Sequence, residues 1–99
     1  MGDEIYIKAD PDIKDLLPGY LENRRKDIEL IKKALEAEDW QEIKTIGHRM
    51  KGSGASYGFV DISQLGKAIE EAAHNQDKEK IKDATRELEK YLSRVRIAG

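Results

Sequence analysis

Apolar residues recur every three or four positions along most of this chain of 99 residues, a spacing typical of amphipathic α-helices. Polar breaks divide the pattern into four segments. These predict helices over about 19–37, from Asp39 to near Tyr57, over about 62–75, and from Asp77 through Val95. Short connections between amphipathic helices favour antiparallel neighbours. The sequence therefore predicts an all-α fold, an antiparallel up-down four-helix bundle.

Aspartates mark the predicted starts of the last three helices. Asp39 with Glu42, and Asp61 with Gln64, resemble capping boxes in which Asp replaces the usual Ser or Thr. Asp77 is the predicted N-cap of the last helix. These three residues set the predicted helix starts.

The N-terminal region predicts two further elements. In ADPDIKDLL, Asp10 is the expected N-cap of a short extra helix over about 11–17, with Pro11 at its first position and Pro18 ending or kinking it. EIYIK, within an N-terminal segment over 1–9, is expected to lie extended across the end of the bundle. We therefore expect a single domain over 1–99, with the bundle spanning about 11–96.

The composition excludes several classes of function. The net charge is −2 with acidic and basic residues interleaved, which argues against a nucleic-acid partner, because such a partner requires a clustered basic face. The chain has no cysteine and therefore no disulfide, thiolate metal site or catalytic thiol. No signal peptide and no apolar run of membrane-spanning length occurs. We expect a cytoplasmic protein without membrane insertion.

The stretch IGHRMKGSGASYGF, residues 46–59, places glycines around a histidine inside a predicted helix. At roughly 100° per residue, the apolar face of this helix lies well away from His48. That face comprises Trp40, Ile43, Ile46, Gly47, Met50, Gly54 and Tyr57. His48 is therefore expected near the centre of the polar face, exposed to solvent. Gly47 and Gly54 lie on or beside the apolar face, where a missing side chain allows another helix to approach closely.

Gly52 differs from those glycines because it lies one turn after His48 on the exposed face. A glycine in a helix interior destabilises the helix by about 1 kcal/mol relative to alanine, and at an exposed position no close packing offsets this loss. A bare backbone there leaves room for a large partner to reach the imidazole, and Lys51 places an ammonium beside it. A neutral imidazole is a good nucleophile toward phosphorus, and a nearby cation balances phosphoryl charge.

The same polar face carries a candidate docking surface, and neither histidine predicts a metal site. The docking residues expected on this face, besides Gly52, are Gln41, Lys44, Thr45 and Ala55. His48 and His74 are the only histidines, and neither has a metal-binding partner at i+4. His74 is expected near the end of its helix, where it interacts with the helix dipole.

The stretch HRMKGSGASYGF, residues 48–59, resembles the signature of histidine-containing phosphotransfer (HPt) domains of bacterial phosphorelays. In that family the histidine is followed after two residues by Lys-Gly, then small residues, and a glycine about ten positions on beside an apolar residue. The similarity extends from DLLPGY through GF, residues 15–59, and the resemblance covers nearly the whole chain.

The resemblance implies a monomeric four-helix bundle that carries a phosphoryl group and is not itself an enzyme. By position, His48 would accept the phosphoryl group from a receiver-domain aspartate and pass it to another receiver. Lys51 would stabilise the phosphoryl group, and Gly52 would clear the approach of the receiver. The implied partners are response-regulator receiver domains and a hybrid sensor histidine kinase. No cofactor is implied in this chain, and the magnesium is expected in the receiver.

The sequence is also compatible with other interpretations. A non-catalytic helical interaction module is the main alternative, although such a module would not need Gly52. A phosphate-binding loop is disfavoured because the lysine precedes Gly52 and no strand leads into it. A free-standing carrier and a domain of a larger hybrid kinase fit the sequence equally, as do both directions of phosphoryl flow.

Overall fold

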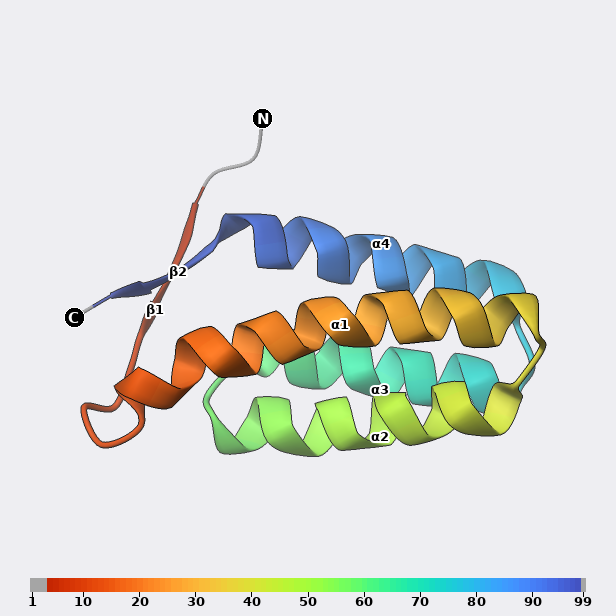
Figure 1. The fold of residues 1–99 in the computed structure, drawn as a ribbon, viewed down its shortest axis with the longest axis horizontal. Helices are drawn as coiled ribbons and strands as arrows, with labels where there is room; N and C mark the ends of the chain where they lie inside the picture. Colours follow the sequence, from red (N-terminus) through yellow and green to blue (C-terminus); the bar gives the residue numbers. More distant parts are fainter. Residues whose placement is uncertain (1–3, 99) are drawn as a thin grey trace.

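The computed structural model describes residues 4–98. Its four helices lie side by side in a bundle, which confirms the predicted helical fold (Figure 1). The helices are α1 (Leu17–Glu36), α2 (Trp40–Ser56), α3 (Val60–His74) and α4 (Lys78–Arg94). A single turn of 3-10 helix, η1 (Lys14–Leu16), precedes α1, and two short strands are β1 (Ile5–Lys8) and β2 (Val95–Ala98). No helix among residues 4–98 is long and apolar enough to cross a membrane.

Three connections of the same length and geometry join consecutive helices. The middle residue of each is left-handed, with φ of 53° at Glu38, 83° at Gly58 and 53° at Gln76. In each connection the amide of the next residue donates to the carbonyl five positions back, at 2.8, 2.8 and 2.9 Å. These bonds satisfy carbonyls that a helix end would otherwise leave unpaired. Tight connections of this kind bring neighbouring helices into contact.

Two of the three predicted aspartate caps are confirmed. The Asp39 carboxylate accepts a hydrogen bond from the amide of Glu42 at 3.2 Å. The Asp77 carboxylate accepts one from the amide of Lys80 at 3.1 Å. Both aspartates therefore begin their helices as the sequence predicts.

The third predicted cap, at Asp61, is wrong. Helix α3 begins earlier, at Val60, and its N-cap residue is Phe59, which makes no side-chain capping bond. The Phe59 side chain is fully buried, so core packing fixes the chain just before the helix. Asp61 instead lies in the first turn, where its negative charge faces the positive end of the helix dipole.

The predicted short helix over 11–17 is not confirmed as a separate element, since within this range only Lys14–Leu16 form a single 3-10 turn before α1 begins at Leu17. The Asp10 carboxylate accepts a hydrogen bond from the amide of Asp12 at 2.9 Å, which forms a turn rather than a helix cap. Helical structure begins only at η1 and continues directly into α1. Pro18 lies in the first turn of α1, where its missing N–H costs nothing, so it begins this helix instead of ending another.

Within the predicted N-terminal segment over 1–9, residues 5–8 form strand β1, whereas residues 1–3 lie outside the described residues. Strand β1 pairs with a partner that the sequence did not indicate. Strands β1 and β2 are parallel, with Ile5 opposite Val95 and Ile7 opposite Ile97. Val95, predicted to belong to the last helix, is buried and begins β2. The alternating sequence VRIA lets Val95 and Ile97 turn toward the protein while Arg96 stays exposed, which suits a strand better than a helix.

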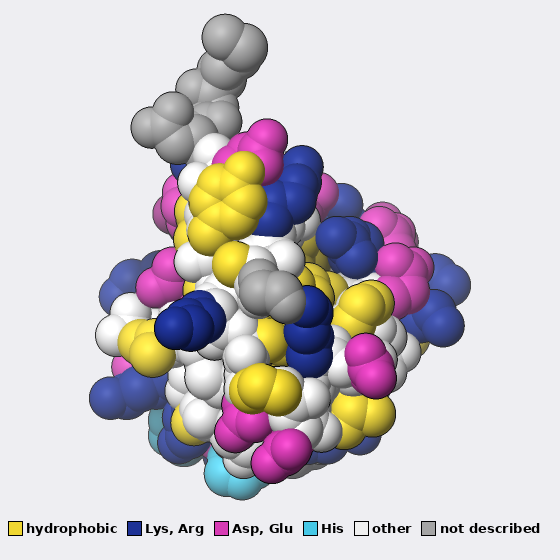
Figure 2. Space-filling model, turned by 90° about the vertical axis from the view of Figure 1, so that its left-hand side faces the viewer, with side chains coloured by type: hydrophobic (Ala, Val, Ile, Leu, Met, Phe, Trp, Pro, Cys, Tyr) yellow, Lys and Arg dark blue, Asp and Glu magenta, His cyan; other side chains and the backbone are white. Residues whose placement is uncertain are grey.

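The strands lie at the end of the bundle where α1 begins and α4 ends (Figure 1). Figure 2 shows this end, with hydrophobic side chains dispersed among basic and acidic ones. Large side chains exposed in this part of the molecule are Tyr6, Leu16 and Val60. No single sign of charge dominates this view of the surface.

All four helices contribute to one hydrophobic core. Full burial of a large apolar side chain stabilises a protein by about 1.5–3 kcal/mol. The largest fully buried side chains are Leu17, Ile31, Ile43, Ile46, Met50, Phe59, Ile62, Ile69, Ile81, Leu88 and Leu92. On α2 the predicted apolar face is confirmed, although Trp40 and Tyr57, at its two ends, are only half-buried.

A small polar cluster joins α1 to α2 beneath the exposed surface. The hydroxyls of Tyr20 and Ser53 lie 2.9 Å apart, and the Arg24 guanidinium donates to the Ser53 hydroxyl at 3.2 Å. The guanidinium also lies over the Tyr20 ring, 4.5 Å from its centroid. Ser53 therefore holds α1 against α2.

Candidate functional site

The contact between α2 and α3 is made by backbone against backbone. A Cβ at Gly47 would lie 2.7 Å from the amide nitrogen of Glu70, and a Cβ at Gly54 would lie 2.5 Å from that of Ser63. Real Cβ atoms do not approach backbone atoms this closely. Both glycines therefore serve the close helix approach that the sequence predicts.

A third glycine, Gly66 on α3, completes this contact, and sequence reasoning missed it. A Cβ at Gly66 would lie 2.5 Å from the amide nitrogen of Lys51 and 2.8 Å from the carbonyl oxygen of Gly47. Gly66 precedes Glu70 by four residues, just as Gly47 precedes Lys51. Each glycine thus receives the backbone of a charged residue from the opposite helix.

The imidazole of His48 lies on the exposed side of this contact, as predicted, and 67% of its side chain is exposed. Its Nδ1 atom lies 2.9 Å from Oε2 of Glu70. The Nζ atom of Lys51 lies 3.4 Å from Oε1 of the same carboxylate. Glu70 therefore bridges the histidine and the lysine across the two helices.

Glu70 is the main residue of the site that the sequence did not reveal. Its side chain is 20% exposed and lies at the margin of the α3 face that packs on α2. One signal was present: Glu70 directly follows Ile69, which lies on the apolar face of α3. That signal does not say which α2 residue it meets, because the relative position of two helices comes from packing.

The electrostatics favour an ionised Glu70. Burial raises the pKa of its carboxyl, but hydrogen bonds from His48 and Lys51 and the lysine charge outweigh burial, so the pKa is lowered from 4.5. An ionised carboxylate only accepts hydrogen bonds, so Nδ1 of His48 must carry the hydrogen. In the neutral ring the lone pair then resides on Nε2, the nitrogen that Glu70 does not engage.

Gly52 occupies open space beside this group. A Cβ at Gly52 would meet nothing within 4 Å, in contrast to Gly47, Gly54 and Gly66. Packing therefore does not require a glycine at position 52, and no close contact offsets the destabilisation of the helix that this glycine causes.

The expected docking residues lie around His48 on α2. Gln41, Thr45 and Ala55 are exposed, whereas Lys44 is half-buried. The Gln41 amide donates to the Thr45 hydroxyl at 3.4 Å, along the helix. The structure thus places Gln41, Thr45 and Ala55 on the surface of α2 and joins the first two by a hydrogen bond.

His74 is the last residue of α3, as predicted. Its Nδ1 atom lies 3.4 Å from Nζ of Lys44 on α2. Within residues 4–98, no group of three or more His, Cys, Asp or Glu side chains is arranged to hold a metal ion.

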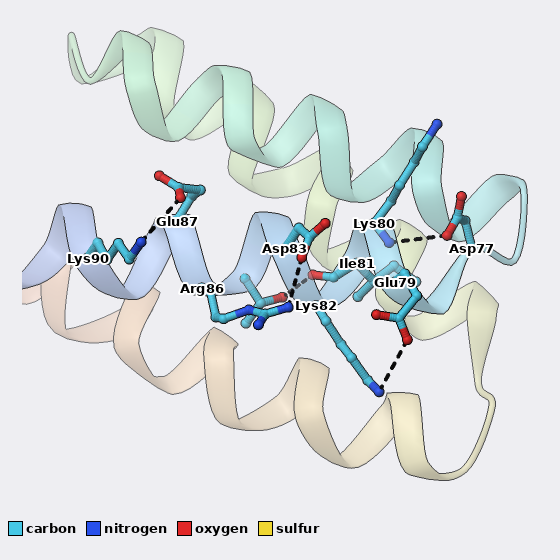
Figure 3. A network of polar contacts seen from close by, with 10 residues as sticks. Asp77, Glu79, Lys80, Ile81, Lys82, Asp83, Arg86, Glu87 and Lys90 are labelled. Atoms are coloured by element: carbon cyan, nitrogen blue, oxygen red, sulfur yellow. Dashed lines mark hydrogen bonds and ion pairs between the residues drawn. The ribbon is translucent and has the colours of Figure 1, made fainter.

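Helix α4 carries charges that are paired with one another. Figure 3 shows the ion pairs that Lys82, Arg86 and Lys90 form with acidic residues one turn earlier. All of these side chains are more than half exposed, so each pair adds little stability.

Comparison with known proteins identifies the family. The family model of the Hpt domain matches residues 15–98, and the chain belongs to this family. Hpt domains carry phosphoryl groups in two-component signalling, where they interact with receiver domains and histidine kinases, and they are carriers rather than enzymes. No curated protein and no solved structure matched the chain.

Proposed function

We propose that this protein is an intermediate of a multistep phosphorelay, in which His48 accepts a phosphoryl group from a receiver-domain aspartate and passes it to another receiver. The observation that supports this proposal is the orientation of one exposed imidazole. The Glu70 carboxylate accepts a hydrogen bond from Nδ1–H of His48, with Oε2 and Nδ1 2.9 Å apart, and this leaves the free lone pair of the ring on Nε2. An accessible nitrogen with a fixed lone pair is suited to nucleophilic attack.

The proposed transfer needs no group beyond the two partners and the magnesium expected in the receiver. Nε2 of His48 attacks phosphorus, the N–P bond forms, and the bond from phosphorus to the aspartyl oxygen breaks, releasing the carboxylate. The ring keeps its hydrogen on Nδ1 and becomes positively charged. The Glu70 carboxylate stabilises that charge through the existing hydrogen bond. The reverse sequence returns the phosphoryl group to the next receiver.

Lys51 and Gly52 have supporting roles in this proposal. The Lys51 ammonium, held 3.4 Å from Glu70, is close enough to turn toward a phosphoryl group on His48 and balance its charge. Gly52 leaves the surface beside the ring open to the receiver. Gln41, Lys44, Thr45 and Ala55 form the rest of the proposed docking face.

The biological setting is also part of the proposal. We infer a bacterial, cytoplasmic, monomeric carrier that works with a hybrid sensor histidine kinase and needs no cofactor of its own. Its helices would follow an antiparallel up-down order, which the three-residue connections support.

Labelling with a phosphorylated receiver domain tests the proposed function. We expect an acid-labile, base-stable label on His48 in the wild-type protein and none in His48→Gln. Lys82→Gln, which neutralises a lysine of α4, is the matched control and should be labelled like the wild type. Label that persists in His48→Gln would overturn the assignment, and a wild-type protein that takes no label would favour the non-catalytic interaction module.

Gly52→Ala tests whether Gly52 provides clearance. Because nothing lies within 4 Å of the added carbon, the substitution should stabilise α2 by up to about 1 kcal/mol. Transfer from the receiver should nevertheless slow down, relative to direct labelling by phosphoramidate, a small donor that does not dock. Equal slowing with both donors would contradict a clearance role.

A further inference from the structure

A surface cavity of about 170 Å³ lies beside the His48 site, between the start of α2 and the end of α3. Its lining residues are Trp40, Gln41, Lys44, Ala73, His74 and Gln76. Lys44 precedes His48 by one helical turn, which corresponds to about 6 Å along the helix axis. The cavity and the imidazole therefore open on neighbouring parts of the same α2–α3 surface.

The polar side chains that line this cavity are rich in hydrogen-bond donors and include no carboxylate. Each of its polar side chains carries at least one N–H donor, and no carboxylate lines the cavity. Trp40 contributes an indole N–H, and the two glutamines contribute amide N–H groups. The two glutamine carbonyls can also accept hydrogen bonds, but no carboxylate is present to balance a bound cation, so the lining is better suited to an oxyanion.

Two basic side chains meet in the cavity. Nζ of Lys44 lies 3.4 Å from Nδ1 of His74. An ammonium group only donates hydrogen bonds, so Nδ1 accepts, and the neutral His74 carries its hydrogen on Nε2. His74 thereby keeps one N–H for a further partner.

The charge of Lys44 is not balanced by an ion pair. Among residues 4–98, no carboxylate oxygen lies within 4.0 Å of its Nζ atom, whereas Lys51, two turns away, is paired with Glu70. Lys44 is also half-buried, so water screens its charge less than that of a fully exposed lysine. The Lys44 ammonium is therefore available to form an ion pair with an anion that enters the cavity.

We propose that this cavity binds a carboxylate side chain of the receiver domain while that domain is docked over His48. The inference rests on the proposed function: Gln41 and Lys44 already belong to the proposed docking face, and His74 is the residue that the inference adds to it. A carboxylate has two acceptor oxygens, which match the Lys44 ammonium and the His74 Nε2–H. The cavity is small enough to take one side chain rather than an extended segment.

The chain contains a natural reporter for this binding. Trp40 is its single tryptophan and it lines the cavity. Adding the receiver domain should therefore change the fluorescence of Trp40, and the change should be weaker in Lys44→Gln. Acetate and inorganic phosphate are added separately as small-anion probes. A change with either anion and none with the receiver would assign the cavity to a free oxyanion and overturn the proposed docking role.

Transfer kinetics provide the decisive measurement. Hydrogen bonds to charged groups contribute about 1.5–3 kcal/mol, so Lys44→Gln should raise KM for the phosphorylated receiver about tenfold or more. His74→Gln should raise KM less, because it removes a neutral donor, and kcat should change less than KM in both variants. Lys82→Gln controls for the lost positive charge and should leave KM unchanged.

The outcomes separate this inference from the proposed function. If His48 is labelled and KM is the same in Lys44→Gln, His74→Gln and the wild type, the cavity does not bind the receiver and the phosphorelay role stands. If Lys82→Gln raises KM as much as Lys44→Gln, the effect is one of net charge and the cavity is not specific. If the wild type takes no label at all, the proposed phosphorelay function is overturned, and the inference that rests on it is overturned as well.

Discussion

The α2–α3 contact and the α1–α4 contact are built in opposite ways. Helices α2 and α3 touch through backbone, at Gly47, Gly54 and Gly66, with no room for one added carbon. Helices α1 and α4 meet through large side chains, and cavities of about 310 and 230 Å³ remain along their contact. The tight contact carries the proposed phosphoacceptor, and the loose contact carries none of the proposed site.

The tight packing of α2 on α3 explains why the proposed site lies at this contact. The Glu70 carboxylate reaches His48 at 2.9 Å and Lys51 at 3.4 Å only because the two helices are close. Catalytic groups lose efficiency when they are displaced by about 1 Å. A contact between backbones leaves less room for such displacement than one between flexible side chains.

Gly66→Ala should break the tight contact and have the largest effect. The added carbon would lie 2.5 Å from the Lys51 amide nitrogen, and backbone cannot yield as a side-chain end can. We expect the free energy of unfolding to fall by about 1–3 kcal/mol, the usual cost of overpacking. The phosphotransfer rate should fall as well, because Glu70 moves away from His48. Urea denaturation and labelling assays measure the two effects.

Gly19→Ala is the matched control for that substitution. Gly19 lies in the first turns of α1, and nothing lies within 4 Å of a Cβ built there. The variant should be as stable as the wild type or more stable, because alanine favours helix. If Gly66→Ala behaved in the same way, the α2–α3 contact would not be as tight as described.

Thr85→Ile should show that the α1–α4 contact tolerates added volume. Thr85 is buried on α4 and lines the cavity of about 310 Å³ against α1. Its hydroxyl donates to the Ile81 carbonyl at 2.7 Å, a carbonyl that the helix itself already satisfies. We expect stabilisation by up to about 1 kcal/mol, measured by thermal denaturation. A loss comparable to that of Gly66→Ala would remove the distinction between the two contacts.

A smaller effect concerns the pH dependence of stability at the tight contact. The pKa of Glu70 is lowered from 4.5 in the folded protein. Its ionised form therefore contributes fully to the free energy of unfolding above about pH 4.5, and this contribution is lost as the pH falls through the lowered pKa. The stability difference between the wild type and Glu70→Gln should therefore shrink as the pH falls below 4.5. Urea denaturation at a series of pH values measures it, and a difference independent of pH would contradict the described pairing.

The smallest effect is expected on the outer face of α4. Arg86 pairs with Asp83 at 2.7 Å, and both side chains are more than half exposed. Arg86→Gln should cost about 0.2–0.5 kcal/mol at low salt, and the cost should decrease as salt screens the pair. Thermal denaturation at two salt concentrations measures this. A cost that does not depend on salt would indicate that packing of the Arg86 side chain, and not its charge, is lost.

Much of the site could be predicted from local patterns. The helical period placed His48 on an exposed face and separated Gly47 and Gly54 from Gly52, because these distinctions depend on angles within one helix. The caps at Asp39 and Asp77 also followed from spacing within a few residues. The start of α3 could not be predicted in this way. Burial of Phe59 sets it, although the local sequence pattern favoured Asp61 as the cap.

Local patterns in the sequence predict the four helices, their apolar faces and the exposed imidazole with Lys51 and Gly52 beside it, because helical geometry relates positions within one helix. The packing of elements that lie far apart in the sequence brings Glu70 to His48, His74 to Lys44 and β1 to β2. Each of these pairs joins residues more than twenty positions apart in the sequence. The two side-chain contacts form because Gly47, Gly54 and Gly66 allow α2 and α3 to pack closely. A local pattern can indicate such a close approach, but it does not say which residues of the partner helix are met.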